Sequence, residues 1–392
     1  MSEDLDAFCP ACEAKTQYLI DWKFAGLNDS IFNYSAAFFK CPSCGLVYIE
    51  NISDEQLSIF YSDECNYSEK THFNIISPKN IEKYNHYKNF IMSLDLFNVS
   101  ITDVGCGRGG FLLWLKKNNW NANCFGVDID LKSIPENDQN NGDNARNQFI
   151  FKEGTAVSLP FVSNTQEFLT YFHVLEHIRN VDAVLQEASR VLKADGYILI
   201  EVPDAEHYED YPVGTAFWLS IREHVNHFSV CAISQALRRN GFSVIRINRG
   251  LLPTPEFEYP SLMILAKKSK GNDDLGNCKG QDIASYVKKS HKELINQVNF
   301  VLALHRKFSS ITFWGCSAEI FSLLPLLDIK DFTLCDSNKL KQESNYQGIP
   351  IKDPKTVQIT GALIIAPYLY ADAIEIDARK LGWPNNAIFR LK

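Results

Sequence analysis

The chain has 392 residues and a formal charge of −8 at pH 7. Because a single hydrophobic core rarely grows beyond about 250–300 residues, we expect two or three domains. The acidic balance argues against a broad phosphate-binding surface, so a nucleic-acid partner is not expected. No apolar run reaches the ~20 residues that span a bilayer, and the start, Met1 to Asp4, lacks a signal-peptide core. Several of the 11 cysteines fall within predicted strands, which favours reduced thiols in a cytoplasmic protein without a membrane partner.

Two Cys-x-x-Cys turns lie near the start, Cys9 with Cys12 and Cys41 with Cys44, and 28 residues separate them. Backbone N–H groups of such turns can bond to the sulfurs, and four thiolates can close a tetrahedral shell around Zn²⁺. We predict a structural zinc ion, because four cysteines leave no open coordination position for catalysis. A redox pair or free thiols are the alternatives. The expected zinc ribbon has strands at residues 18–22 and 37–40, within a domain of residues 1–78.

Helical signals follow the second cysteine turn. Ser53 and Gln56 form the Ser-x-x-Gln pattern of a capping box, which predicts a helix that runs to about Tyr61. Apolar residues at helical spacing predict a second helix over residues 80–97. This helix leads into a central domain, which we place at residues 79–268.

A glycine-rich turn, Asp103-Val-Gly-Cys-Gly-Arg-Gly-Gly110, lies between a predicted strand at 101–104 and a predicted helix at 110–118. Glycines lack Cβ, so backbone N–H groups can approach a ligand closely, and a helix start offers unpaired donors. A second apolar strand, 124–128, ends in Asp128 about twenty residues on, where a Rossmann-type site places the acid that binds ribose hydroxyls. Another nucleotide ligand on a doubly wound domain is the alternative.

The central domain continues as alternating strands and helices, which predicts a parallel sheet covered on both faces. Gly241 is placed to end the last helix. The Asn- and Asp-rich stretch 135–147 is the expected exposed loop. The remaining predicted strands are 148–152, 167–173, 197–202, 243–248 and 262–267, and the remaining helices are 181–192 and 232–240.

Residues 269–281 are the predicted linker, rich in Gly, Asn and Asp. A long amphipathic helix follows over 282–308, and then a smaller α/β unit completes a third domain of residues 282–392. The sequence of this unit resembles that of the central domain. A small-residue turn, Gly315-Cys-Ser-Ala318, is followed by a strand that ends in an acid, Asp336. The predicted strands of this unit begin near residues 311, 332, 348 and 362.

The pattern Asp-x-Gly-x-Gly-x-Gly resembles motif I of class I S-adenosylmethionine (SAM) methyltransferases. Later stretches agree in order, namely Gly154-Thr-Ala-Val-Ser-Leu-Pro-Phe161, Val174-Leu-Glu-His-Ile178 and Val191-Leu-Lys-Ala-Asp-Gly-Tyr197. The resemblance implies an α/β fold with a Rossmann-like methyltransferase sheet, an N-terminal zinc ribbon and a smaller C-terminal Rossmann-like domain. It also implies SAM as cofactor, with zinc as a structural ion. The implied cofactor residues are Asp103 at the methionine ammonium, Gly105, Cys106 and Gly107 by backbone, Asp128 at the ribose, Ile129 and Thr155 at the adenine, and Leu175 on the methyl-donor side.

The three-part order resembles the sugar C-methyltransferases of deoxysugar pathways, in which a nucleotide-linked 4-keto-deoxyhexose is methylated at carbon 3. The matching residues are Gly105-Cys106, Glu223-His224 and the turn at Gly315. The resemblance implies that His224 is the general base, that Glu223 is its partner or a substrate contact, and that His177 reaches the substrate. A tyrosine of the N-terminal domain, for which Tyr67 is our candidate, enters the pocket. The chain departs from the family at Ile221-Arg222, where a tyrosine and a histidine are expected.

A carbon beside a ketone becomes a nucleophile only when its proton leaves, so this chemistry needs a base at the C–H and donors at the developing enolate oxygen. Imidazole suits the base because it titrates near neutral pH. His224 and His227 could instead hold the fold by hydrogen bonds, and His173 and Glu176 could serve packing. Two other functions stay open: O- or N-methylation of another sugar or small metabolite, and a zinc-ribbon module that binds nucleic acid or protein.

Overall fold

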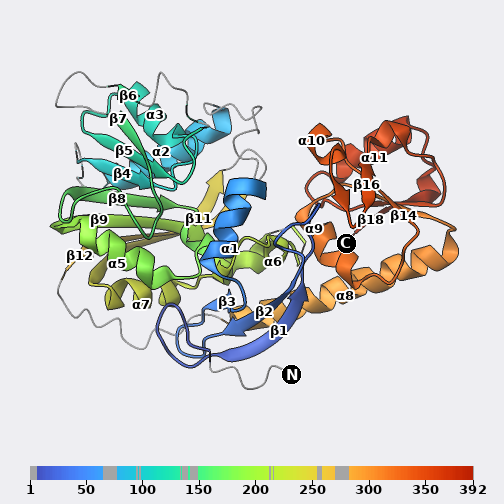
Figure 1. Cartoon of the computed structure of the whole chain (residues 1–392), viewed down its shortest axis with the longest axis horizontal. Coiled ribbons are helices and arrows are strands. Elements are labelled where there is room, and N and C mark those ends of the chain that lie inside the picture. Colours follow the sequence, from blue (N-terminus) through green and yellow to red (C-terminus); the bar gives the residue numbers. More distant parts are fainter. Residues whose placement is uncertain are drawn as a thin grey trace.

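The computed structural model describes residues 7–64, 77–93, 96, 99–132, 134, 140–141, 149–211, 213–214, 216–253, 258–269 and 282–391. Their strands form three sheets, of four, eight and six strands. The largest sheet belongs to the central domain and the six-stranded sheet to the C-terminal unit, and the N-terminal sheet lies at the base between them (Figure 1). The described residues contain no helix long and apolar enough to cross a membrane.

The central sheet has the strand order β11-β12-β9-β8-β4-β5-β7-β6. Its strands are β4 Ile101–Val104, β5 Cys124–Asp128, β6 Asn140–Asn141, β7 Phe149–Glu153, β8 Gln166–Phe172, β9 Leu192–Pro203, β11 Phe242–Pro253 and β12 Glu258–Lys268. The expected parallel arrangement holds for β4, β5, β7, β8 and β9. The final strand β12 pairs antiparallel with both β11 and β9, because it returns from β11 without a crossover helix and inserts beside β9.

Helices cover both faces of the central sheet (Figure 1). On one face, α2 (Pro78–Met92) contacts α3 (Gly110–Lys117), and on the other, α5 (Val181–Val191) contacts α7 (Val230–Arg239). The predicted helix over 80–97 ends earlier, at Met92, because Ser93 caps it with its N–H on the Asn89 carbonyl. Gly241 follows α7 with φ of +80°, as its predicted place after that helix requires.

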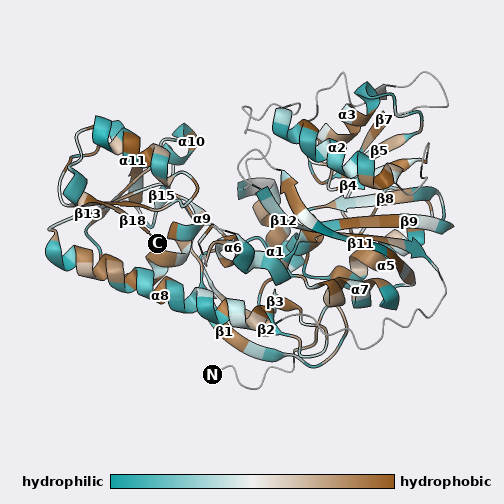
Figure 2. Cartoon of the chain, turned by 180° about the vertical axis from the view of Figure 1, so that it is seen from behind, coloured by the Kyte–Doolittle hydropathy of each residue, from teal (hydrophilic) through white to brown (hydrophobic). Residues whose placement is uncertain are grey.

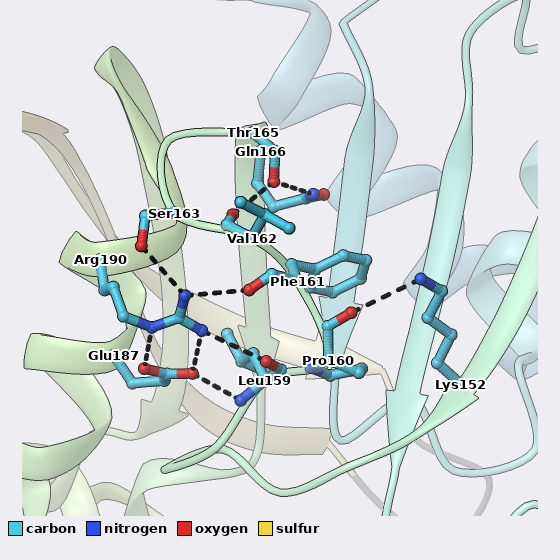
Figure 3. Close-up of polar contacts among 10 residues, drawn as sticks. All are labelled: Lys152, Leu159, Pro160, Phe161, Val162, Ser163, Thr165, Gln166, Glu187 and Arg190. Atoms are coloured by element: carbon cyan, nitrogen blue, oxygen red, sulfur yellow. Dashed lines mark hydrogen bonds and ion pairs between the residues drawn. The ribbon is translucent and has the colours of Figure 1, made fainter.

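The loop after β7 is held down by one arginine of α5. The Arg190 guanidinium pairs with Glu187 through two 2.7 Å bonds and donates to the carbonyls of Phe161 and Leu159 (Figure 3). Glu187 in turn accepts from the Leu159 N–H at 2.6 Å. Three of these hydrogen bonds reach Leu159 and Phe161 and fix the loop that begins near Thr155 to α5. Of the predicted loop 135–147, only Asn140–Asn141 is described, and these residues form the short strand β6 rather than a loop, because they pair with β7.

The N-terminal sheet consists of β1 (Gln17–Lys23), β2 (Ser35–Lys40) and β3 (Val47–Ile49), with a fourth strand contributed by the central domain. That strand is β10 (Asn226–His227), which pairs antiparallel with β3. The capping box at Ser53 forms as predicted and starts α1 (Asp54–Ile59). The chain then continues as one π-helical turn, η1 (Phe60–Glu64), so the helical segment extends slightly beyond Tyr61.

The C-terminal unit begins with α8 (Ile283–Lys307), a long helix that runs from the N-terminal sheet to the second α/β unit (Figure 2). The strand order of that unit is β15-β16-β14-β13-β17-β18, with β13, β14, β16, β17 and β18 parallel. Its strands are β13 Ile311–Trp314, β14 Phe332–Cys335, β15 Asn345–Tyr346, β16 Ile349–Lys352, β17 Ala362–Ile365 and β18 Ile388–Arg390. Its helices are α9 Ala318–Leu323, α10 Lys339–Gln342 and α11 Ala371–Lys380, with the 3₁₀ turns η4 Leu324–Leu326, η5 Pro354–Thr356 and η6 Asn385–Ala387. Most of the predicted linker, residues 270–281, lies outside the described residues.

One continuous hydrophobic core joins the N-terminal sheet, α8 and the C-terminal unit. Hydrogen bonds cross the same junction, from Trp22 Nε1 to Ser322 Oγ at 3.1 Å and from the Ala25 N–H to the Phe321 carbonyl at 2.8 Å. Arg222 lies at this junction. Its guanidinium donates to the Ala25 carbonyl at 2.5 Å and lies over the rings of Phe32 and Phe321. The residue at which the sequence departs from the sugar C-methyltransferases therefore joins the N- and C-terminal units.

We expect Arg222→Ala to lower the free energy of unfolding by roughly 2–4 kcal/mol, because it removes a charged hydrogen bond and two cation–π contacts. Urea unfolding of the full chain measures this change. Arg238, an exposed arginine of α7, provides the control, and Arg238→Ala should change stability by less than about 0.5 kcal/mol. Equal losses in the two variants would contradict a clamping role for Arg222.

Candidate functional site

The four cysteines of the N-terminal turns form one cluster. Their ligand atoms all lie within 4.8 Å of one another, with Cys9 and Cys44 sulfurs 3.5 Å apart and Cys12 and Cys41 sulfurs 3.4 Å apart. The N–H groups of Ala11 and Cys44 each donate to a sulfur at 3.4 Å. The two turns thus bring four sulfurs and two backbone donors close together, and four such thiolates could serve as ligands of one metal ion.

The glycine-rich turn after β4 closes onto the acid at the end of β5. The Gly105 N–H donates to the Val127 carbonyl at 2.8 Å, and the Gly107 N–H donates to Asp128 Oδ2 at 2.7 Å. Gly105 and Gly107 have φ of +72° and +53°, a conformation that glycine adopts without strain. No described atom lies within 4 Å of a Cβ placed on Gly107, so no part of the chain that the structure describes covers the turn at this residue.

Asp103, in contrast, is almost completely buried at the carboxyl end of β4. Its Oδ1 accepts from Thr170 Oγ1 of β8 at 2.8 Å. Burial raises the pKa of Asp103 to about 7, despite the hydrogen bond from Thr170, and the nearby Asp128 charge adds to the effect. A cationic group bound beside it would return this carboxyl to its charged form.

The other predicted cofactor residues differ in exposure. Ile129 is exposed immediately after Asp128 and offers an apolar surface, and Thr155 is exposed in the turn that follows β7. Cys106 is half-buried, with its sulfur toward the Gly107 carbonyl at 3.9 Å. Leu175 is fully buried in the core beneath the site, so in this conformation its side chain offers no surface to a ligand.

A charged cluster occupies the carboxyl ends of β8 and β9. His173 adopts φ of +55° and directs Nδ1 to Glu176 Oε1 at 3.1 Å and Nε2 to Glu201 Oε2 at 2.9 Å. Both glutamates are fully buried. Burial lowers the pKa of His173, but the charges and hydrogen bonds of Glu201 and Glu176 outweigh it and raise the pKa to about 10. His173 is therefore a cation clamped by two acids.

His177 and His224 face each other beside this cluster. Their ring centroids are 4.8 Å apart, with the rings edge to face. His177 belongs to the 3₁₀ turn η2 (Leu175–His177) and bonds through Nδ1 to the Glu223 carbonyl at 3.1 Å. Burial, followed by the charges of His177, His227 and His173, holds the pKa of His224 well below its usual value, so this ring is neutral at pH 7. The Glu223 side chain is half-buried next to it.

Backbone hydrogen bonds fix the segment that carries Glu223 and His224. The Val225 N–H donates to the Glu176 carbonyl at 2.8 Å, and the Ile49 N–H of β3 donates to the Val225 carbonyl at 2.9 Å. Asp54 of α1 accepts from the N–H of Asn180 at 3.0 Å, beyond the turn that carries His177. The N-terminal domain thereby helps to build the site.

An aromatic residue of the N-terminal domain does reach this site. Tyr61 contacts His177 edge to face at 5.8 Å between ring centroids. Our candidate for such a residue, Tyr67, lies outside the described residues and stays a prediction. Tyr61 precedes Tyr67 in the sequence, and our prediction did not include it.

His227 has a structural environment. It is fully buried in β10, stacks on Phe38 at 5.9 Å and bonds through Nδ1 to Tyr208 at 3.2 Å. Burial lowers its pKa to about 3. These contacts match the alternative in which His227 holds the fold, with a tyrosine rather than backbone as its partner.

Sequence reasoning missed Glu201 and Lys83. Glu201 interrupts an otherwise apolar strand, Ile198 to Val202, and a lone carboxylate at such a position is a signal for a buried charge partner. Lys83 of α2 has its pKa lowered by burial, while the charges of Glu201 and Asp103 oppose that shift. Its placement beside two acids required the packing of α2 on the sheet, which no local pattern encodes.

The glycine turn and the histidine cluster lie at one edge of the sheet. Strand order reverses at β4, with β5 on one side and β8 on the other, and open α/β sheets bind ligands at such a reversal. A Cβ on Gly105 would lie 2.6 Å from Val174 Cγ2, directly before the turn that carries His177. The two groups of residues therefore lie next to each other at this edge of the sheet.

A family model described as a methyltransferase domain matches residues 76–247. The central part of the chain is therefore a class I SAM-dependent methyltransferase domain. The demethylmenaquinone methyltransferase of Lactobacillus johnsonii is 31% identical over 98 residues, which are 24% of this chain and 40% of that protein. The uncharacterized methyltransferase YcgJ of Bacillus subtilis is 29% identical over 131 residues, 33% of this chain and 46% of that protein. The chain thus spans less than half the length of these curated relatives.

Solved structures align with about half of the chain. The structure of Bacillus subtilis YcgJ aligns with a TM-score of 0.37 and 18% identity, over 48% of this chain and 100% of that one. A SAM-dependent methyltransferase from Aquifex aeolicus aligns with a TM-score of 0.39 and 17% identity, over 52% of this chain and 97% of that one.

We expect Asp128→Asn to weaken binding of S-adenosylhomocysteine about 10- to 100-fold, because the ribose would lose a charged acceptor worth roughly 1.5–3 kcal/mol. Titration calorimetry measures this loss. Asp336→Asn is the matched control, since Asp336 accepts from the Cys316 N–H at 2.8 Å in the C-terminal unit just as Asp128 accepts from Gly107. Equal weakening in both variants would contradict the assignment of the ribose acid.

Proposed function

We propose that the chain is a SAM-dependent methyltransferase that acts on a small molecule. The observation that carries this proposal is the contact between Gly105 and Val174, which brings the cofactor turn next to the segment of His177 and His224. A neutral imidazole beside a methyl-donor site is suited to accept a proton from the group to be methylated.

The residues present fit SAM. Asp128 would hold the ribose hydroxyls, the exposed Ile129 would lie against the adenine, and Asp103 would face the ammonium, whose charge favours the ionised carboxyl. Open space above Gly107 leaves room for the ligand. When bound, the cofactor supplies an activated methyl group, so alignment of the acceptor is the main task left to the protein.

In the leading form of the proposal, the acceptor is carbon 3 of a nucleotide-linked 4-keto-deoxysugar. His224 takes the proton from that carbon, and the electron pair left behind forms the new bond to the methyl group. Glu223 and His177 contact the substrate or orient the base, because their positions adjoin His224. The three-part chain supports this form, since the N-terminal strand β3 holds the His224 segment and the C-terminal unit packs against the N-terminal domain.

O- or N-methylation of another small molecule is the alternative that the same histidine would serve. Its reaction would also pass a proton to His224, but from a hydroxyl or an amine. The carbon-bound hydrogen distinguishes the two forms, because only C-methylation requires its removal.

Incubation with a nucleotide-linked 4-keto-deoxysugar in deuterated water, with S-adenosylhomocysteine in place of SAM, should give deuterium at carbon 3. We expect His224→Ala to slow this exchange by about 10²–10⁴-fold, the usual contribution of a general base. Mass spectrometry of the recovered sugar measures it. The exposed His207 provides the control, and His207→Ala should exchange at the wild-type rate.

Two outcomes would contradict the leading form. Exchange retained in His224→Ala, in protein that still binds S-adenosylhomocysteine, would place the base elsewhere. Methyl transfer to a sugar hydroxyl without any exchange would favour O-methylation.

We further propose that the four cysteines hold a structural zinc ion. Support comes from the converging sulfurs and from the position of the cluster below β3, where Ser229 Oγ donates to the Cys44 carbonyl at 2.7 Å. The cluster lies within the hydrophobic core shared with α5 and α7. Zinc bound there would stabilise the sheet that carries β10.

We expect one zinc per purified chain, and Cys12→Ser should remove most of it and lower the thermal midpoint, because metal binding is coupled to folding. Elemental analysis and thermal unfolding measure the two effects. Cys106, a half-buried cysteine outside the cluster, is the control, and Cys106→Ser should retain the zinc. Zinc retained by Cys12→Ser would contradict the four-thiolate site.

A further inference from the structure

Glu176, His177 and His224 form a second cluster of potential metal ligands. Each offers one ligand atom, and these three atoms all lie within 4.8 Å of one another. Glu176 is fully buried and His224 is 6% exposed, whereas His177 is half-buried and faces Tyr61. The group lies at the carboxyl end of β8, on the turn that also touches Gly105.

The hydrogen bonds of this cluster leave electron pairs without donors. A carbonyl can only accept, so His177 Nδ1 donates to Glu223, which leaves Nε2 facing Glu176 Oε1 at 3.7 Å. Glu176 Oε2 and His224 Nδ1 are buried and have no hydrogen-bond partner among the described residues. Buried acceptors without donors cost about 1–3 kcal/mol each, so the folded chain gains from any cation placed among them.

Glu176 has one oxygen that its described neighbours leave without a partner. His173 bonds to the other oxygen of Glu176 and also to Glu201. Arg179, the nearest arginine along the chain, pairs with Glu50 instead. The second oxygen of Glu176 is therefore buried without a hydrogen-bond partner among the described residues, and a metal ion beside it would supply one.

We propose that Glu176, His177 and His224 bind one divalent transition-metal ion. Two imidazoles and one carboxylate are the ligand set of open catalytic-type sites for Zn²⁺, Co²⁺, Mn²⁺ or Fe²⁺, in which further positions take water or substrate. Such ligands lie about 2.0–2.2 Å from the ion, so two of them in a tetrahedral site are roughly 3.4 Å apart. The present ligand atoms, all within 4.8 Å of one another, would move closer together on binding through rotation of the side chains. The Glu223 carbonyl orients His177, as outer hydrogen bonds orient histidine ligands elsewhere.

The ion and the proton that the proposed function assigns to His224 would compete for the same ring. Metal binding can be measured without any substrate or methyl donor, so the test of this inference does not depend on whether the chain transfers a methyl group. Metal bound by Glu176, His177 and His224 can be distinguished from metal bound by the four cysteines, because thiolate ligands have their own optical signature.

The experiment titrates the purified full-length chain, with its zinc retained, with Co²⁺. We expect one additional Co²⁺ per chain, with the weak visible absorption of nitrogen and oxygen ligands and no thiolate charge-transfer band. His177→Ala should weaken this binding more than about 100-fold, because a direct ligand contributes at least as much as its outer partners. His207→Ala, in which an exposed histidine is removed, should bind as the wild type does.

A thiolate band on titration would show Co²⁺ entering the cysteine cluster, and Cys12→Ser should abolish that band without affecting the second ion. If His177→Ala fails to fold, pulsed electron paramagnetic resonance of the Mn²⁺-loaded wild type provides a second test, because coordinated imidazole gives nitrogen couplings. No additional Co²⁺ in the wild type, its retention by His177→Ala, or Mn²⁺ without imidazole couplings would each overturn the proposal.

Discussion

The peptide of Val225 is the constraint on which the arrangement of the site depends. Its N–H bonds to the carbonyl of Glu176 in the central domain, and its carbonyl accepts from Ile49 of the N-terminal sheet. His224, the preceding residue, therefore has its backbone fixed from both sides. A side chain held in this way loses little conformational freedom on binding a substrate or an ion, which is the usual advantage of building a site on regular structure.

This constraint gives the N-terminal domain a physical connection to the chemistry. β3 pairs with β10 shortly after His224, and the cysteine cluster packs in the core that includes Tyr48 of β3. The zinc ion that we propose there would stabilise β3, whose hydrogen bond to Val225 fixes the backbone next to His224. Arg222 extends the connection to the C-terminal unit by reaching Ala25 and Phe321 from the same segment. A short stretch of chain thus contacts all three parts of the molecule.

Much of the fold could be predicted from the sequence because its signals are local. The strand at 101–104, the strand at 124–128, the capping box at Ser53 and the glycine after α7 all occur where the patterns place them. The antiparallel insertion of β12 could not be predicted in this way, since strand order depends on contacts between distant segments.

In the candidate site, too, residues with a local sequence signal could be predicted, whereas those placed by contacts between distant segments could not. Asp128 follows from its strand and spacing, whereas the clamp of His173 between Glu176 and Glu201 requires β8 and β9 to be neighbours. β10 consists of only two residues, so no periodicity could reveal it, although it decides where His224 lies. Tyr61 was not predicted, because its contact with His177 depends on how the helical segment after Ser53 packs against the central domain.

The two Rossmann-like units share a local structure, a turn that donates to an acid, but the surroundings of that acid differ. In each, an acid after the second strand accepts an N–H from the turn after the first, at 2.7 Å for Asp128 and 2.8 Å for Asp336. In the C-terminal unit, Lys341 donates to the Cys316 carbonyl at 2.8 Å and pairs with Asp336 at 3.4 Å.

The first glycine of each turn is equally crowded, because an added Cβ would meet the Pro367 ring at 2.3 Å on Gly315 and Val174 Cγ2 at 2.6 Å on Gly105. The two turns differ at the acid. Lys341 pairs with Asp336 in the C-terminal unit, whereas Gly107, which donates to Asp128, has no described atom within 4 Å of an added Cβ. The acid there is satisfied internally and stabilises the fold, while Asp128 keeps an open approach. A shared turn-and-acid motif thus becomes a binding site only where the surrounding chain leaves it uncovered.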